Sequence, residues 1–252
     1  MAASFRLDGR CALVTGASRG LGQAMAVALA EAGADVTGVA TGDLAETGAR
    51  VEAAGRRFTG IVRDLRGPGA ARGVVDEAAA AMGRLDILVN NAGTIRRADA
   101  VDFTEADWDA VIDLNLKSVF FLAQAAGRRF IAQGGGGKIV NIASVLSFQG
   151  GIRVPSYTAS KSGVLGLTRL LANEWAAKGI NVNAIAPGYM ATANTAPLRA
   201  DAVRSAEILA RIPAGRWGEP ADLDGAVVFL SSAASDYVHG TVIAVDGGWL
   251  AR

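Results

Sequence analysis

Short runs of Val, Ile and Leu alternate with longer Ala-rich stretches along the whole chain, and this alternation restricts the fold more than any other feature. The strand-like runs are Ala12–Thr15, Asp35–Ala40, Phe58–Val62, Ile87–Asn90, Lys138–Asn141, Asn181–Ile185 and Thr241–Val245. Helical patterns fill the intervals at Leu21–Ala32, Leu44–Ala54, Pro68–Met82, Glu105–Gln133 (long enough to contain a break), Tyr157–Lys178, Ala200–Ala210 and Ala221–Ser231. Nearly continuous apolar strands separated by helices are typical of a parallel sheet covered on both faces. The pattern therefore predicts an α/β fold of the Rossmann type, with a doubly wound parallel sheet.

No stretch of the 252 residues has the composition of a linker between domains. The run Gly134–Gly137 is too short to separate domains, and we interpret it as a turn that ends a helix before a strand. We predict a single dinucleotide-binding and catalytic domain over residues 1–252.

Charge and composition exclude several function classes. The 25 Lys and Arg residues nearly balance the 24 Asp and Glu residues, so nothing indicates binding to nucleic acid or to a membrane surface. One His and one Cys cannot form a His-based metal site or an internal disulfide. No apolar run approaches the ~18 residues of a membrane helix, and the first residues do not resemble a signal peptide. We expect a cytoplasmic protein with a small-molecule substrate, and no metal, nucleic-acid or membrane partner.

A glycine-rich loop, residues 15–22, follows the first predicted strand and opens the first predicted helix. It carries Gly16, Ser18, Arg19, Gly20, Leu21 and Gly22. Glycines let the backbone approach a pyrophosphate closely, and the N-terminus of a helix presents N–H groups to its charge. The loop therefore predicts a dinucleotide site.

The end of the second strand bears on the choice of cofactor. NAD enzymes usually place an acidic residue there, whereas NADP enzymes place a basic group near it. This chain has Ala40 and Thr41 at the strand end, and Arg19 in the first loop could pair with a 2′-phosphate. Both features favour NADP. NAD stays an alternative, because the sequence defines strand ends only approximately and Asp43 could be the acidic residue at the end of this strand.

Further cofactor contacts are expected after the third and fourth strands, since ligands of such sheets bind beyond the carboxyl ends of the strands. The candidates are Asp64, Leu65, Asn91, Ala92 and Gly93.

Ser144, Tyr157 and Lys161, within the segment 138–161, are the strongest candidates for catalysis. Tyr157 and Lys161 are four residues apart on one predicted helix and share a face. A nearby ammonium favours the phenolate of a tyrosine and makes it a better acid or base near neutral pH. Ser144 follows the adjoining strand and could hydrogen-bond the oxygen of a substrate.

The glycine loop, Asn90–Gly93, Asn115, Ser144, Tyr157 with Lys161, and Pro187-Gly188 together resemble the short-chain dehydrogenase/reductase family over nearly the whole chain. The resemblance implies a homotetrameric oxidoreductase that moves a hydride between NAD(P) and an alcohol or carbonyl. It implies Tyr157 as acid/base, Lys161 as its partner and ribose ligand, and Ser144 as substrate ligand. Asn115 would hold a water of a proton relay. Pro187, Gly188 and Thr192 would line the nicotinamide.

Residues 141–157 and 211–218 further resemble the sugar-acid branch of this family, which acts on hexonic acids such as 2-keto-3-deoxygluconate, 2-deoxygluconate or gluconate. An acidic sugar requires an arginine and polar partners. The candidate substrate residues are Arg153, Ser147, Gln149 and Arg96. Residues 189–212 are expected to form a lid over the substrate.

Two other functions remain open at this point. The first seventy residues resemble reductases of acyl-carrier-protein substrates, and Arg128 and Arg129 could dock an acidic carrier, although Asn173 stands where a basic residue is expected. The other alternative is a nucleotide-binding protein without turnover, against which the retention of Tyr157 and Lys161 argues.

Overall fold

The computed structural model describes residues 4–252, whose strands form one parallel sheet. The strands are β1 (Cys11–Thr15), β2 (Asp35–Ala40), β3 (Phe58–Val62), β4 (Ile87–Asn90), β5 (Gly137–Ile142), β6 (Ile180–Pro187) and β7 (Val242–Val245). Their order is β3-β2-β1-β4-β5-β6-β7, and every neighbouring pair is parallel. The order reverses direction between β1 and β4, which is the switch point of a doubly wound sheet. The predicted fold class is confirmed.

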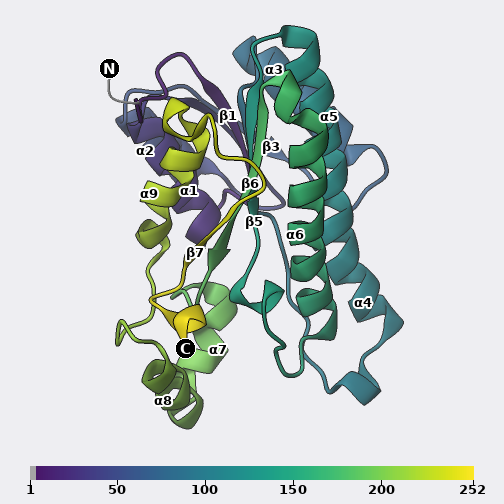
Figure 1. Ribbon diagram of the computed structural model, residues 1–252, viewed down its shortest axis with the longest axis vertical. Coiled ribbons are helices and arrows are strands. Elements are labelled where there is room, and N and C mark those ends of the chain that lie inside the picture. The colour runs from purple at the N-terminus through teal and green to yellow at the C-terminus, as the bar shows by residue number, and fades with distance from the viewer. Residues whose placement is uncertain (1–3) are drawn as a thin grey trace.

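Helices cover both faces of the sheet (Figure 1). They are α1 (Gly20–Glu31), α2 (Ala45–Ala53), α3 (Ala70–Met82), α4 (Glu105–Ile112), α5 (Ser118–Gln133), α6 (Pro155–Trp175), α7 (Ala196–Ala200), α8 (Ala202–Arg211) and α9 (Asp224–Ser231). In Figure 1, α1, α2 and α9 lie on one side of the sheet, and α3, α5 and α6 on the other. The short helices α7 and α8 lie beyond the end of the sheet, near the C-terminus.

The strands are rich in apolar residues because each face of the sheet packs against a helical layer. In β1, Val14 belongs to the core formed with α1, α2 and α9, whereas its neighbour Leu13 belongs to the core formed with α3 and α5. Both side chains are fully buried. Burial of each contributes about 1.5–3 kcal/mol, so the β1 strand is fixed from both sides and holds the loop that follows it.

Two local features refine the sequence prediction. The predicted helix Glu105–Gln133 is interrupted by one π-helical turn at Asp113–Lys117, which separates α4 from α5. The glycine run ends α5, as predicted, because Gly134, Gly135 and Gly136 all have positive φ. Helix α7 has no counterpart in the prediction, which placed a single helix at Ala200–Ala210.

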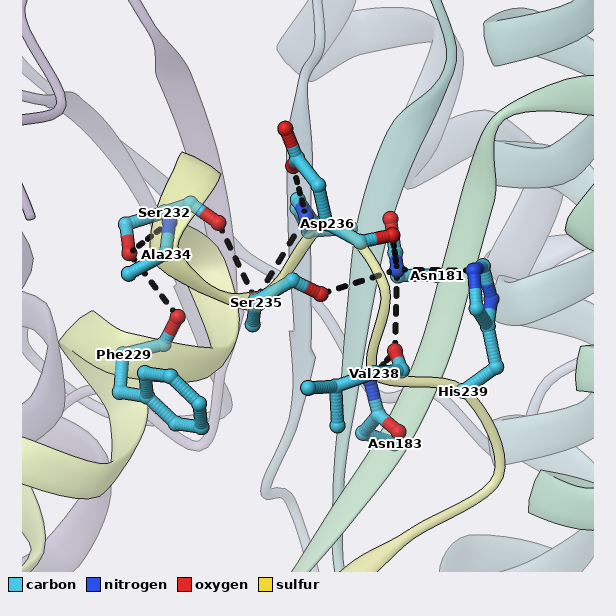
Figure 2. Close-up of polar contacts among 10 residues, drawn as sticks. Asn181, Asn183, Phe229, Ser232, Ala234, Ser235, Asp236, Val238 and His239 are labelled. Carbon is cyan, nitrogen blue, oxygen red and sulfur yellow. Dashed lines mark hydrogen bonds and ion pairs between the residues drawn. The ribbon is translucent and has the colours of Figure 1, made fainter. Parts of the chain in front are cut away.

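A polar cluster closes the amino-terminal end of β6. Figure 2 shows Asn181 among Asp236, Val238 and His239, which belong to the chain that follows α9. The amide of Asn181 donates to the carbonyl oxygens of Ser235, Asp236 and Val238, at 3.1, 2.9 and 2.9 Å. Asn183 donates to the Val238 oxygen as well, at 2.8 Å. These bonds satisfy backbone carbonyls in the segment between α9 and β7.

Among residues 4–252, no helix combines the length and the apolar character needed to cross a membrane. Within the same residues, no three His, Cys, Asp or Glu side chains gather in a way that could hold a metal ion.

Candidate active site

A cavity of about 730 Å³ opens where the carboxyl ends of β1, β2, β4 and β5 meet. Most of the predicted cofactor residues line it. They are Gly16, Ser18, Arg19, Gly20, Leu21, Gly22, Ala40, Thr41, Asp64, Leu65, Asn91, Ala92, Gly93, Tyr157, Lys161 and Thr192. The fold thus brings the glycine loop and the Tyr-Lys pair, more than a hundred residues apart in the chain, to one cavity.

Close backbone packing explains why the loop requires glycine. Gly16 has φ +67°, and a Cβ there would come within 2.8 Å of the Asn91 amide nitrogen. A Cβ on Gly22 would overlap the carbonyl oxygen of Gly16. Only glycine permits this geometry, which leaves the N-terminus of α1 open to a phosphate group. The residues present therefore fit a dinucleotide.

Thr15 joins the glycine loop to the loop after β4. Its hydroxyl accepts hydrogen bonds from the backbone N–H groups of Asn91 and Ala92, both at 3.0 Å. The side-chain amide of Asn91 donates in return to the backbone carbonyl oxygen of Thr15 at 2.9 Å. Asn91 therefore joins the two loops through its side chain and its backbone N–H, and it also lines the cavity.

Arg19 also lines the cavity, and its side chain is exposed. Among residues 4–252, its guanidinium makes no hydrogen bond and no ion pair. Asp43 lies outside the cavity lining, and its carboxylate accepts from the N–H of Ala45 at the start of α2. Asp64 lines the cavity, but Arg66 pairs with its carboxylate at 2.7 Å and lowers its pKa.

The side chains of Tyr157, in the first turn of α6, and Ser144, two residues after β5, interact with each other. Burial raises the pKa of Tyr157, whereas a hydrogen bond with the Ser144 hydroxyl and the charge of Arg97 lower it. A second hydroxyl, that of Ser147, accepts from the Ser144 N–H at 3.3 Å and donates to the Lys161 carbonyl at 2.7 Å. This pair of bonds ties the Ser144 loop to the helix that carries Tyr157.

Lys161 lies one turn further along α6 and is only 5% exposed. Its ammonium donates to the carbonyl oxygen of Ile142 at 2.6 Å, and lies 5.7 Å from the centre of the Tyr157 ring. Burial lowers the pKa of Lys161 to about 8. The end of β5 therefore holds the lysine near the Tyr157 ring, and burial destabilises its charged form.

Asn115 is fully buried in the π-helical turn and holds the loop after β4. Its side chain accepts from the Thr94 N–H at 2.8 Å and donates to the Thr94 oxygen at 2.9 Å. It also contacts the Ser160 hydroxyl at 3.4 Å. These contacts place Asn115 beside α6, but Asn115 does not line the cavity itself.

The predicted substrate residues lie at different distances from this cavity. Arg96 lines it and pairs with Asp107 at 3.2 Å. Arg153 has a positive φ of 64°, is 62% exposed, and pairs with Asp99 at 3.2 Å, outside the cavity lining. Ser147 is occupied within the protein as described.

Gln149 accepts a hydrogen bond from Arg211 of α8 at 3.0 Å. The segment 189–212 also meets the cavity directly, through Ala191, Thr192, Ala193, Asn194 and Arg199. Pro187 and Gly188 are not in the cavity lining. Gly188 instead packs against Asp246, where a Cβ would come within 2.6 Å of the backbone.

Sequence reasoning missed the electrostatic role of Arg97, the cation whose charge reaches Tyr157. Its guanidinium donates to the Asn194 oxygen at 3.2 Å. The sequence places Arg96 and Arg97 side by side, but it could not say which of the two charges acts on the pKa of Tyr157. It also missed further lining residues, namely Val39, Arg63, Arg66, Thr94, Leu114, Ile142, Ala191, Ala193, Asn194 and Arg199.

Comparison with known families places this site in its class. A family model described as enoyl-(acyl carrier protein) reductase matches residues 16–250. The chain belongs to the short-chain dehydrogenase/reductase family, as the sequence motifs predicted.

Individual relatives narrow the likeness. The chain is 65% identical to the 2-dehydro-3-deoxy-D-gluconate 5-dehydrogenase of Escherichia coli, over 99% of this chain and 98% of that protein. A crystal structure with bound NADP, assigned as a 2-deoxy-D-gluconate 3-dehydrogenase of Agrobacterium tumefaciens, is 60% identical with a TM-score of 0.94, covering 99% of both chains. The gluconate 5-dehydrogenase of Burkholderia cenocepacia, in complex with NADP and tartrate, is 42% identical with a TM-score of 0.94, covering 99% of this chain and 98% of that one.

Proposed function

We propose that this protein is a sugar-acid dehydrogenase that interconverts a secondary alcohol and a ketone on a deoxyhexonic acid of the 2-dehydro-3-deoxy-D-gluconate type. The observation that carries the reaction class is the single cavity that collects the glycine loop, Tyr157 and Lys161. The substrate class rests on the 65% identity to the E. coli enzyme along the whole chain. A nicotinamide cofactor bound in the cavity would exchange the hydride, and the side chains would handle the proton.

Tyr157 is the proton donor and acceptor in this proposal. The raised pKa keeps its hydroxyl protonated in the resting protein, as the donor role in carbonyl reduction requires. Ser144 shares a hydrogen bond with it and would hold the substrate oxygen next to it. Lys161 supplies positive charge beneath the ring, and Asn115 shapes the loop beside the helix.

We propose NADP as the preferred cofactor. Arg19 lines the same cavity as Ala40 and Thr41, which offer no carboxylate to a phosphate, and its guanidinium has no partner among residues 4–252. Asp43, which kept NAD open, is engaged at the start of α2. Two of the related crystal structures hold NADP, in agreement with this choice.

Arg97 is our candidate for the substrate carboxylate, in place of Arg153. Neither side chain lines the cavity, but the charge of Arg97 lowers the pKa of Tyr157, and its guanidinium contacts the segment 189–212. We propose that this segment is the lid. Its contacts with Arg97 and Gln149 join it to both loops that border the catalytic residues. Substrate that binds Arg97 would thus also affect the position of the lid, because Arg97 contacts Asn194 in that segment.

We further propose a cytoplasmic homotetramer. Phe121, Ile131 and Leu170 on α5 and α6 are each between 45% and 49% exposed, which gives these helices apolar surface for contact with other copies. Light scattering of the purified protein measures the assembly, and a monomer at micromolar concentration would contradict it.

The test is a panel of 2-dehydro-3-deoxy-D-gluconate, 2-deoxygluconate, gluconate and an acyl thioester, each with NAD and NADP, followed by the absorbance of the reduced nicotinamide. We expect turnover on a hexonic acid with NADP preferred. Activity on the thioester alone would support the carrier-protein alternative, and binding of NADP without turnover of any of these would support the non-catalytic one.

Arg97→Ala and Arg153→Ala form a matched pair for the carboxylate. We expect the Arg97 change to raise KM for the acid about tenfold or more relative to a neutral polyol, because a charge-assisted hydrogen bond is lost. The Arg153 change should leave this ratio within about twofold, since its partner Asp99 lies outside the cavity. The reverse result would return the role to Arg153.

A further inference from the structure

A buried hydroxyl behind the glycine loop contacts the turn that carries Arg19. Thr47 of α2 is fully buried, and its hydroxyl donates to the carbonyl oxygen of Ala17 at 2.7 Å. The N–H of Ala17 donates on its other side to the Val39 oxygen at 3.1 Å. The turn is thus hydrogen-bonded to β2 through the Ala17 N–H and to α2 through the Ala17 carbonyl.

Gln23 completes this support from α1. Its amide donates to the Thr47 hydroxyl at 3.0 Å and lies 3.4 Å from the Ser18 oxygen. Its own oxygen accepts from Arg50 at 3.2 Å. Two successive carbonyls of the turn, those of Ala17 and Ser18, therefore accept from Thr47 and Gln23, which are both buried. Hydrogen bonds in such an environment fix geometry strongly.

Helix α2 is a rigid support for this network. Gly48, next to Thr47, packs so closely on Phe58 of β3 that a Cβ would come within 2.8 Å of the ring. The helix also begins just after Thr41, so the segment that borders the cavity at the end of β2 is continuous with the one that supports the loop. A shift of Thr47 would therefore change the position of the Arg19 turn relative to Thr41.

The Arg19 side chain depends on this turn for its direction. The residue has an extended backbone, φ −165° and ψ 171°, immediately before α1, and its side chain makes no cap hydrogen bond. No side-chain partner among residues 4–252 holds the guanidinium, so the backbone of Ala17 and Ser18 sets where it can reach.

We propose that Thr47, together with Gln23, is a positioning residue that orients Arg19 toward the 2′-phosphate of NADP and so sets the preference for NADP over NAD. This inference rests on the cofactor choice proposed above. Thr47 touches neither cofactor nor substrate in this scheme. Its influence is confined to the Ala17–Arg19 turn, so it should change cofactor binding and leave the chemistry at Tyr157 intact.

Three threonine variants test the proposal. Thr47→Val removes the hydroxyl and keeps the shape, and Thr47→Ser restores the hydroxyl. Thr37→Val is the matched control, because Thr37 on β2 is equally buried and its hydroxyl has no partner within residues 4–252. We expect Thr47→Val to raise Kd for NADPH about five- to tenfold with little change for NADH, and kcat at saturating NADP to stay within about twofold. Thr47→Ser and Thr37→Val should behave as wild type.

A double-mutant cycle identifies the route of the effect. In an Arg19→Ala background, Thr47→Val should not weaken NADPH further, because the residue that it orients is gone. Equal losses in both backgrounds, or equal losses for NADPH and NADH, would overturn the proposal and leave Thr47 a general support of the loop.

Hydrogen exchange separates this proposal from the proposed function. In the protein without cofactor, the amides of residues 17–20 should exchange about five- to tenfold faster in Thr47→Val than in Thr37→Val. Unchanged exchange would refute the support by Thr47 itself. Should wild type bind NADH more tightly than NADPH, the NADP assignment and the specificity role fail together, while the exchange result still decides whether Thr47 orders the turn.

Discussion

Replacing the buried lysine should make the protein more stable and inactive at the same time. Burial lowers the pKa of Lys161 from 10.5 to about 8. At about 1.4 kcal/mol for each tenfold change in an equilibrium, the charged ammonium costs the folded state about 3 kcal/mol near pH 7. Lys161→Met removes this cost, but it also leaves the Ile142 carbonyl without its donor, a loss of about 1–2 kcal/mol. We expect a net gain of about 1–2 kcal/mol in the free energy of unfolding, with kcat reduced about a hundredfold or more.

The pH dependence gives the sign of the effect. Between about pH 8 and pH 10.5 the unfolded lysine binds a proton that the folded one has released, so the stability of wild type rises with pH in this range. Urea unfolding without cofactor, at one protein concentration and from pH 7 to pH 9.5, should show the advantage of the Met variant shrinking by about 1.4 kcal/mol per pH unit above pH 8.

Lys117→Met is the control, because the Lys117 side chain is 59% exposed and pairs only with Asp113. It should change stability by no more than about 0.5 kcal/mol at any of these pH values. A Lys161→Met protein that is less stable than wild type, by an amount that does not vary with pH, would refute the argument that burial of the ammonium strains the fold.

Three further changes test other parts of the site. Tyr157→Phe should lower kcat about 10²- to 10⁴-fold in both directions with nearly unchanged cofactor Kd, and a rate near wild type would exclude Tyr157 as the acid/base. Gly22→Ala should weaken cofactor binding about a hundredfold or more, because its Cβ would overlap the Gly16 oxygen, whereas Gly73→Ala on the exposed face of α3 should leave Kd unchanged in the same titration. Burial raises the pKa of Asp224 from 3.8 to about 6, so Asp224→Asn should gain about 1 kcal/mol at pH 7.5, after allowance for its partial exposure, and thermal unfolding should show that gain disappear near pH 4.

The architecture was predictable because each element satisfies a local rule. The strand β1 is buried at every position, since alternate side chains enter opposite cores, and the glycines after it are required by contacts as close as that of Gly22 with Gly16. Local pattern alone thus predicted the sheet, the loop and the helix that carries Tyr157 and Lys161.

What the sequence could not supply are the contacts between distant segments. Gln149 was predicted as a substrate ligand, yet it binds Arg211, 62 residues away. Arg153 is close to Tyr157 in the chain, but the backbone turns at its positive φ and its side chain pairs with Asp99. Arg97, on another loop, is instead the arginine whose charge lowers the pKa of Tyr157, and its guanidinium donates to the Asn194 oxygen. Nearness in sequence was a poor guide to nearness in space for these long, exposed side chains.

The same burial acts in opposite directions on the two central residues of the site. It raises the pKa of Tyr157 and lowers that of Lys161, so both groups tend toward their neutral forms in the resting protein. Burial thus favours the protonated tyrosine, although the tyrosine must lose its proton to act as a base. Lys161, with a pKa of about 8, still carries its positive charge at pH 7. Any additional positive charge near the phenol, such as that of Arg97, moves its pKa back toward the neutral range. The site therefore becomes competent for oxidation only when its charges are assembled around Tyr157. For this reason Arg97 is better placed than Arg153 to link recognition of an acidic substrate with proton transfer.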